Sequence, residues 1–336
     1  MKERRLIKRN EYAEYLFNLF MKAFQKAPFE IICTLLRVSG IADKQWDPFE
    51  EGLIAFKDYN WLLKKSKHSP TPFGQWRMGL LMYCQAVEMS GFHRMLANCL
   101  RVLQGKRYHL NSTGHLGRAN KKRPFSWIPP SATQKFNYLK GIAKECGEEK
   151  LVEYIDSFFL DDIRNAFSHS DYVLTKEFFR WTENGLAQQI DLKTLNLLIY
   201  NTREFYSAFW FCYEQLLKNF AHLPRYHKWP NYEILELLND GEKLYGFHIH
   251  FSNGSKASFI RSKKGVDCVN VTIEKDGTMN FFVGLLDALE HVWKINGQTV
   301  TDWSSLNKKE NKTPSLIIRN ILKKFKKARM NSSVYN

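Results

Sequence analysis

Hydrophobic residues recur at steps of three and four through much of the first 220 positions, the spacing of one helix face. A long stripe predicts one helix over 74–104, and Gly91 within it indicates a close approach to another helix. The same spacing predicts helices over 11–27, 47–66, 132–146, 148–170 and 191–220. The chain is therefore expected to be mainly α-helical over this part.

The helix predicted over 191–220 has an unusually wide apolar face. Its main stripe includes Phe205 and Phe209, and the additional aromatic residues Tyr206, Trp210 and Tyr213 extend that face. A helix with apolar residues around most of its circumference has more hydrophobic surface than one neighbour can cover. We expect this helix to be buried on all sides or to pack at a subunit interface.

The hydrophobic period changes from helical to alternating after Tyr245. Alternating residues from Phe247 to Phe251 and from Val269 to Ile273 predict strands, and Asn253-Gly254 and Asp276-Gly277 are hairpin-turn signals. Strands here and a helix over 284–294 would make a small antiparallel α+β unit. The last segment, around 317–325, is predicted to be a basic amphipathic helix.

These elements predict a mainly α fold with four parts. They are an N-terminal helical extension (1–70), a helical bundle (73–221), a small antiparallel β unit with a helix (230–300) and a basic amphipathic tail (307–336). Within the bundle, residues 105–130 lose all periodicity and are predicted to form a long loop. Long loops in compact domains are often functional.

Positive charge is concentrated in two segments. The chain has 50 Lys and Arg against 34 Asp and Glu, and residues 89–144 contain eleven basic residues with no acidic one. Residues 307–336 add nine basic residues against Glu310 alone. Such segregation indicates a surface that binds a polyanion, with RNA as the expected partner, and the alternative is a solvated basic face. The candidate RNA-binding residues in the loop are Lys106, Arg107, Arg118, Lys121, Lys122 and Arg123.

Several classes of function are excluded or disfavoured by what the sequence lacks. The six cysteines are scattered without a C-x-x-C pair, and no apolar run is long enough for a signal peptide or membrane span. We therefore expect a cytoplasmic protein with reduced thiols. His248-x-His250 could supply two metal ligands from one strand face, but no third or fourth ligand is evident, so neither a metal nor a cofactor is predicted.

The segment 161–172, at the end of a predicted helix, brings three candidate catalytic side chains together: Arg164, Asn165 and His169. Asn165 and His169 are four residues apart and share a face, and the long Arg164 side chain can reach across. Arg164-Asn165-x-x-x-His169 resembles the R-x(4–6)-H signature of HEPN-domain proteins, over roughly residues 73–221. Some members have Tyr two residues after the His; here Tyr172 is three after it and is left out of the site.

The resemblance implies a helical HEPN-like bundle and a metal-independent endoribonuclease. In that chemistry the RNA 2′-hydroxyl attacks the adjacent phosphate, histidine transfers protons and arginine stabilises the charged phosphorane. One motif histidine per chain for two proton transfers implies a homodimer with a composite site, to which helix 191–220 would contribute contacts. The family also implies a toxin or anti-phage role. The β unit is a candidate sensor, a contact for an inhibitory partner or a cover for the bundle.

Three alternatives to the nuclease remain open from the sequence. The motif can instead be an ordinary helix end at which Arg164 pairs with Asp161 and His169 is incidental. The runner-up function is a non-catalytic RNA-binding or scaffold protein that keeps the motif for phosphate contact or folding. A weaker third possibility is an interaction module that binds nucleic acid or an anionic membrane through the basic tail.

Overall fold

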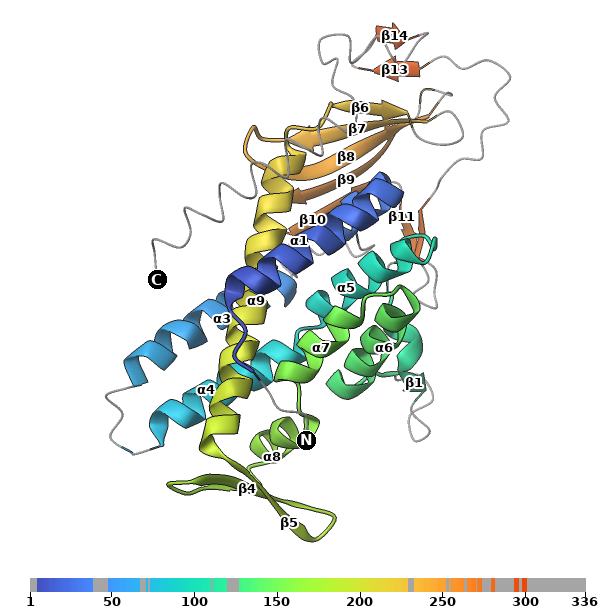
Figure 1. The fold of residues 1–336 in the computed structure, drawn as a ribbon. Coiled ribbons are helices and arrows are strands. Elements are labelled where there is room, and N and C mark those ends of the chain that lie inside the picture. Colours follow the sequence, from blue (N-terminus) through green and yellow to red (C-terminus); the bar gives the residue numbers. More distant parts are fainter. Residues whose placement is uncertain are drawn as a thin grey trace. The chain divides into compact units, whose positions relative to one another are not determined.

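A computed structural model shows a mainly helical chain with a small antiparallel sheet (Figure 1). Two compact units divide it: a helical unit of residues 1–34 and 48–212, and a sheet unit of residues 35–47 and 213–336. The structure describes residues 5–38, 48–66, 71, 73–109, 111–119, 127–228, 233–251, 254, 256–262, 265–269, 271–273, 279–281, 293–295 and 298–300.

Most predicted helices are present, with two of them interrupted. The helical unit contains α1 (Arg9–Lys26), α3 (Pro48–Lys65), α4 (Gly74–Glu88), α5 (Ser90–Leu103), α6 (Ala132–Glu145), α7 (Glu149–Phe158) and α8 (Asp161–Ser168). The division between the units falls within α2 (Pro28–Leu36) and within α9 (Leu192–Phe220).

The N-terminal helix packs into the helical core, and residues on both sides of the predicted boundary near residue 70 belong to one compact unit. Tyr12 of α1 is fully buried, and its ring lies 4.7 Å from that of Tyr154 in α7 and 5.1 Å from that of Phe205 in α9. Helix α1 is buried because its apolar stripe is too long for one neighbouring helix to shield from water.

The long helix predicted over 74–104 is two helices, α4 and α5, because the backbone of Met89 is extended (φ −59°, ψ 97°). Beyond this break, Gly91 allows α3 to approach α5. A Cβ at Gly91 would lie only 2.3 Å from the Phe49 ring, so only glycine fits without rearrangement. The close approach expected from the sequence is confirmed.

The core of the helical unit is a cluster of aromatic rings around Phe92. Phe92 is fully buried, with its ring centroid 4.7 Å from that of Tyr206 and 4.9 Å from that of Phe209. Trp210 is 5% exposed and packs 4.5 Å from Phe49. Tyr206 and Trp210 are thus covered by the chain itself, which leaves this part of α9 unavailable for the expected subunit contact.

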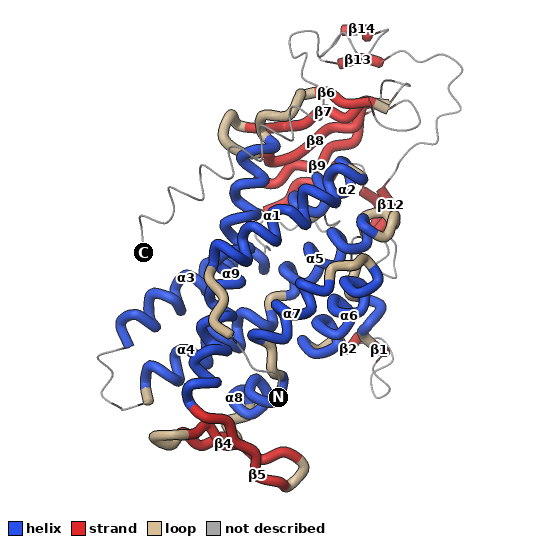
Figure 2. The backbone as a smooth tube through the Cα atoms, viewed as in Figure 1, coloured by secondary structure: helices blue, strands red, loops and turns tan. Residues whose placement is uncertain are grey.

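A three-stranded sheet between α8 and α9 was not predicted. It contains β3 (Tyr172–Leu174), β4 (Phe178–Glu183) and β5 (Leu186–Asp191) in sequential antiparallel order, and Figure 2 shows it beside α8. Phe179 and Trp181 are buried on one face, while Val173 and Leu186 are 61% and 67% exposed. The sheet therefore continues the helical unit from the end of α8 and presents apolar side chains to its surface.

The loop predicted over 105–130 is only partly described. It contains a short 3-10 helix at Gly114–Leu116 and the paired strands β1 (Arg118–Ala119) and β2 (Trp127–Ile128). Residues 120–126 lie outside the described residues. The visible part is held to α6, because Gln134 donates a hydrogen bond to the Leu116 carbonyl and His115 packs against Tyr138.

The sheet unit is built on a five-stranded antiparallel sheet in the order β10-β9-β8-β7-β6. Its strands are β6 (Tyr226–Lys228), β7 (Ile234–Asn239), β8 (Leu244–His250), β9 (Lys256–Ser262) and β10 (Gly265–Val269), followed by the pairs β11 (Val271–Ile273) with β12 (Met279–Phe281) and β13 (Trp293–Ile295) with β14 (Gln298–Val300). The predicted hairpin between β8 and β9 is confirmed, whereas β6 and β7 were not predicted. Residues 284–292 of the predicted helix and the basic tail lie outside the described residues, and Trp293 and Lys294, where that helix was expected to end, belong to strand β13.

No helix among the described residues is both long and apolar enough to cross a membrane. Cys33, Cys84, Cys99, Cys146 and Cys212 are free thiols, and Cys33, Cys99 and Cys212 are buried. Burial raises the pKa of each of these thiols, which keeps them protonated and unreactive near neutral pH.

Buried His93 predicts a specific acid sensitivity of the fold. Burial, helped by the nearby Lys135 ammonium, lowers its pKa to about 3, while the unfolded imidazole titrates near 6.5. The unfolded state therefore binds a proton that the native state excludes, so stability falls as the pH drops from about 6.5 towards 3. Between pH 7 and 5 the expected loss from this residue is about 2 kcal/mol.

Urea unfolding of the wild type and of His93→Gln at both pH values checks this expectation. The variant will be less stable at both pH values because the imidazole is packed against Phe92 and Phe136. The informative quantity is the difference between pH 7 and pH 5, which should shrink by about 2 kcal/mol in the variant. An unchanged pH dependence would contradict the assignment of this proton to His93.

Candidate functional site

The three candidate catalytic residues lie on or at the end of α8. Arg164 and Asn165 are within the helix, and His169 is its C-cap residue. The helix ends in a Schellman arrangement, in which Ser170 has φ 59° and the Asp171 amide donates to the Ala166 carbonyl at 2.9 Å. This ending fixes the backbone of His169, whose side chain is exposed.

Tyr83 of α4 holds the start of α8 in place. Its hydroxyl donates to the Leu160 carbonyl (2.8 Å) and accepts from the Leu160 amide (3.0 Å). Leu160 is the N-cap residue of α8, so these two bonds satisfy the backbone where α7 ends and α8 begins. The predicted helix over 148–170 is therefore interrupted at Leu160, and α8 does not continue α7 as one helix.

Arg164 is held by two carboxylates. Its Nη2 lies 3.1 Å from Glu88 Oε1 at the end of α4, and its Nε lies 3.7 Å from Asp161 Oδ1, one turn earlier in α8. The side chain is only 15% exposed. The pairing with Asp161, which the structural alternative predicted, is present, and Arg164 thereby links α8 to α4.

Asn165 completes the network around the guanidinium. Its Oδ1 accepts a hydrogen bond from Arg164 Nη1 at 2.8 Å, and its Nδ2 donates to Asp161 Oδ2 at 3.2 Å. The guanidinium is therefore oriented from two sides before any ligand binds. His169 follows Asn165 by one turn, and its amide donates to the Asn165 carbonyl at 3.0 Å. The side chains of Arg164 and Asn165 are thus joined by a hydrogen bond, and His169 follows them at the end of the same short helix.

Glu88 and Lys135 belong to the surroundings of Arg164 and were missed by sequence reasoning. Lys135 of α6 is 5% exposed, and its Nζ donates to Ser90 Oγ at 3.1 Å. Burial lowers its pKa, Glu88 opposes that shift, and the cationic Arg94 and Arg164 add to it. A signal was present: Lys135 occupies the apolar stripe of α6 between Ala132 and Phe136, where a lysine is unusual.

Two of the predicted RNA-binding residues, Lys106 and Arg107, lie away from the motif. Lys106 and Arg107 are exposed and follow the C-terminal end of α5, whereas Arg164 contacts Glu88 just before its N-terminal end. A helix of 14 residues separates these two ends by roughly 20 Å. Arg118 is exposed on β1, and Lys121, Lys122 and Arg123 lie outside the described residues.

Tyr172 has a packing role. It opens β3, and its ring stacks on that of Phe179 at 5.2 Å with an interplanar angle of 11°. It also lies 5.4 Å from the ring of Phe167 in α8. Tyr172 therefore joins the small sheet to the end of α8.

His248 and His250 lie on one face of β8, as their spacing required, with ring centroids 6.0 Å apart. Both have protein partners: His248 Nδ1 lies 2.7 Å from Ser258 Oγ, and His250 Nε2 lies 2.7 Å from Glu236 Oε2. Burial would raise the pKa of Glu236, but the bonds from His250 and Arg225 outweigh it and lower this pKa to about 2. No group of three potential metal ligands occurs among the described residues.

The arrangement on α8 therefore offers one oriented guanidinium, one amide and one exposed imidazole within a single short helix. An imidazole can transfer protons near neutral pH, and a guanidinium can hold the oxygens of a phosphodiester. Comparisons of the chain with protein-family models, with curated proteins and with solved structures found no match.

Proposed function

We propose that the protein is a metal-independent endoribonuclease of HEPN type whose active site is formed by Arg164, Asn165 and His169. The observation that carries the proposal is the network in which Asn165 and two carboxylates orient Arg164 on the helix that ends at exposed His169. Phosphodiester cleavage by a 2′-hydroxyl requires a preoriented donor and a proton-transfer group, and one short helix supplies both.

The proposed reaction uses the nucleophile already present in RNA. A histidine removes the 2′-hydroxyl proton, the oxygen attacks the adjacent phosphorus, and a protonated histidine donates to the departing 5′-oxygen. Arg164 holds the non-bridging oxygens as their negative charge increases. The products are a 2′,3′-cyclic phosphate and a free 5′-hydroxyl, and neither proton transfer involves a metal-bound water.

Two proton transfers with one motif histidine per chain favour a two-fold dimer. Because Tyr206 and Trp210 are buried within the chain, the contact is expected near α8 itself. The small sheet beside α8 exposes Val173 and Leu186, which offer apolar surface for such a contact. A two-fold axis there would place both copies of His169 at one cleft.

The acidic neighbours of Arg164 set a condition on RNA binding. Glu88 is 45% exposed, so a phosphate can displace it from Arg164 with little loss of stability. The attraction for RNA must come mainly from the basic residues of 105–130 and 307–336, which contribute salt-dependent affinity with little sequence choice. A toxin or anti-phage role is proposed from the family resemblance alone.

The test is an RNA cleavage assay in excess EDTA. Purified protein should cut a single-stranded RNA under these conditions, and the fragments should carry 2′,3′-cyclic phosphate and 5′-hydroxyl ends. A 2′-O-methyl RNA of the same sequence should remain intact because its nucleophile is blocked. Cleavage that requires an added divalent metal would overturn the mechanism.

The second candidate is a non-catalytic RNA-binding protein. The ion pairs of Arg164 with Glu88 and Asp161 favour it, since they give the arginine a structural role in joining α8 to α4. This candidate predicts salt-sensitive RNA binding with no fragments at any protein concentration. The assay above distinguishes the two.

A further inference from the structure

A groove lies between α3, α4 and α9, on the face of the helical unit away from α8. It consists of two adjoining hollows of roughly 360 and 500 Å³ that share Lys64 as a lining residue. On an ideal helix, Trp76 and Gly79 of α4 point roughly 120° and 180° away from Glu88, which contacts Arg164. The groove is therefore separate from the candidate catalytic site.

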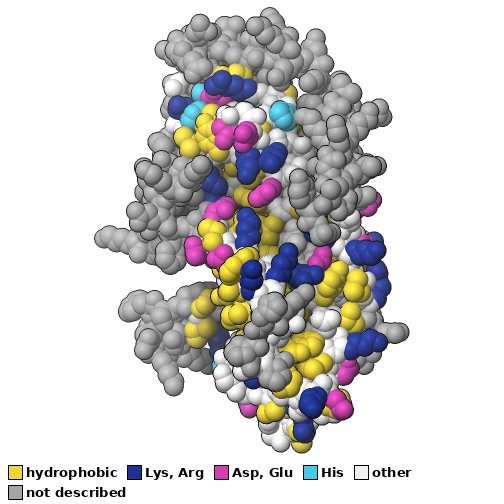
Figure 3. Space-filling model, turned by 90° about the vertical axis from the view of Figure 1, so that its left-hand side faces the viewer, with side chains coloured by type: hydrophobic (Ala, Val, Ile, Leu, Met, Phe, Trp, Pro, Cys, Tyr) yellow, Lys and Arg dark blue, Asp and Glu magenta, His cyan; other side chains and the backbone are white. Residues whose placement is uncertain are grey.

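The described residues that line the groove include three basic side chains and no acidic one. Arg203 is largely neutralised, because its Nη2 lies 2.9 Å from Glu204 Oε1. Lys57 and Lys64 are both exposed and supply the excess positive charge. Figure 3, which views the side where α3 and α4 lie in Figure 1, shows Lys and Arg side chains interspersed with hydrophobic ones, with Asp and Glu side chains on the same face.

Aromatic side chains alternate with the lysines along the groove. Trp61 is 59% exposed, which is unusual for a residue that normally buries most of its surface. Trp76 and Tyr200 line the neighbouring hollow, and the Arg203 guanidinium lies 5.0 Å from the centre of the Tyr200 ring. Ring faces and cations therefore share one surface.

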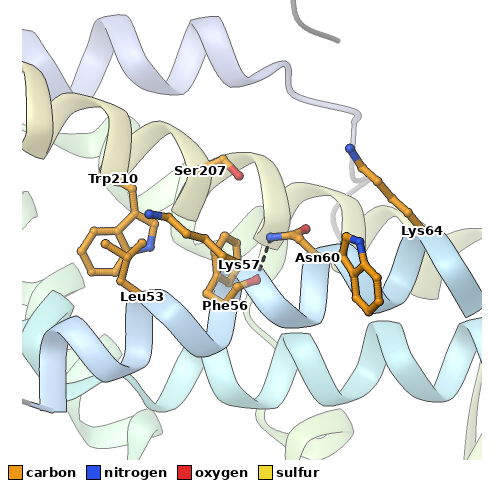
Figure 4. A pocket seen from close by; sticks show the side chains of 8 residues that line it. Leu53, Phe56, Lys57, Asn60, Lys64, Ser207 and Trp210 are labelled. Carbon is orange, nitrogen blue, oxygen red and sulfur yellow. Dashed lines mark hydrogen bonds between the residues drawn. The ribbon is translucent and has the colours of Figure 1, made fainter.

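Figure 4 shows the first hollow in detail, with Leu53, Phe56 and Lys57 of α3 facing Ser207 and Trp210 of α9. Asn60 donates a hydrogen bond to the Phe56 carbonyl at 3.0 Å, which fixes its amide at the rim. The floor is apolar and the rim is basic and polar. This combination suits a ligand with flat apolar faces joined by anionic links.

We propose that this groove binds single-stranded nucleic acid, with bases stacked on Trp61 and its aromatic neighbours and phosphates held by Lys57 and Lys64. From Asn196 to Trp210, both lining residues, α9 extends roughly 21 Å, enough for several nucleotides. Unpaired bases are required because a duplex hides its base faces. The basic tail of this chain is a poor occupant, since its charge has the same sign as the groove.

Binding of a fluorescent 2′-O-methyl oligouridylate of roughly 20 nucleotides, longer than a typical single-strand site, tests the proposal. This probe cannot be cleaved through its 2′-oxygen, so the result does not depend on the proposed nuclease. Trp61→Ala should weaken binding about tenfold and Trp61→Phe less than threefold, because phenylalanine keeps a stacking face. Lys57→Ala/Lys64→Ala should weaken binding about fivefold near 0.1 M salt and less at higher salt.

The matched control is Lys150→Ala/Lys176→Ala, which removes the same charge from exposed positions outside the groove. The control variant should change the affinity less than twofold. Trp61→Ala should keep the wild-type melting temperature, because the Trp61 side chain is mostly exposed. If the same variants also bind an oligothymidylate more weakly, the groove is a site for both single-stranded RNA and single-stranded DNA. Equal affinity of the groove variants and the control, or Trp61-dependent binding of a duplex, would overturn the proposal.

Discussion

Replacement of His169 by alanine is expected to reduce the rate of RNA cleavage by about a thousandfold, and replacement of Arg164 by a similar factor. General acid–base groups typically contribute about 10²–10⁴-fold, and one donor to a developing anionic oxygen about 10²–10³-fold. His169 gives the cleaner test because its side chain is exposed at the end of α8, so its loss should leave the fold unchanged.

Arg164 requires more care, because its side chain also connects α8 to α4. Arg164→Lys keeps the charge and part of the contact with Glu88 but loses the planar fork of donors, so a loss of cleavage with normal stability would indicate a role beyond packing. Lys150→Ala is the matched control, since it removes a cation from an exposed position of the same unit that lies outside both the loop and the small sheet. Wild-type rates in His169→Ala would contradict the assignment of the site.

The helices of this protein were largely predictable, whereas the breaks within them were not. The stripe from Leu80 to Cys99 continues across Met89, so periodicity alone indicates one helix. The break depends on tertiary contacts, including the packing of Phe49 against Gly91. At the second break, Tyr83 contributes both hydrogen bonds to Leu160 from more than seventy positions earlier in the chain. Local patterns contain no information of this kind.

The small sheet after α8 could have been found from the sequence. Phe179 and Trp181 alternate with polar residues, and Asn184-Gly185 follows them with φ values of 50° and 78°, as a two-residue hairpin turn needs. The signal was hidden because the segment is short and lies between two strong helical patterns. By contrast, β3 has only three residues and depends on its pairing with β4.

The candidate site was located from the spacing of Arg164, Asn165 and His169, but its electrostatic surroundings were not. Glu88 is at the end of a different helix, and its contact with Arg164 depends on how α4 and α8 pack. Lys135 is likewise brought near through α6. The sequence indicated a basic environment from charge counts, while the structure places carboxylates next to the arginine and the basic pair Lys106 and Arg107 at the far end of α5.

Phe92→Ala is expected to destabilise the protein by about 3–5 kcal/mol, the largest effect on folding that we predict. The ring is fully buried and lies within 6.5 Å of the centroids of several aromatic neighbours from α6 and α9, so its removal leaves a cavity that these rigid rings cannot close. Ile54→Ala, at a 51% exposed position of α3, should cost less than about 0.5 kcal/mol. Chemical unfolding of the two variants measures both values. If Phe92→Ala lowers the free energy of unfolding by less than about 1 kcal/mol, the aromatic cluster is not the core that holds α5 against α9. The position of α8, which we attribute to that core, would then need another explanation.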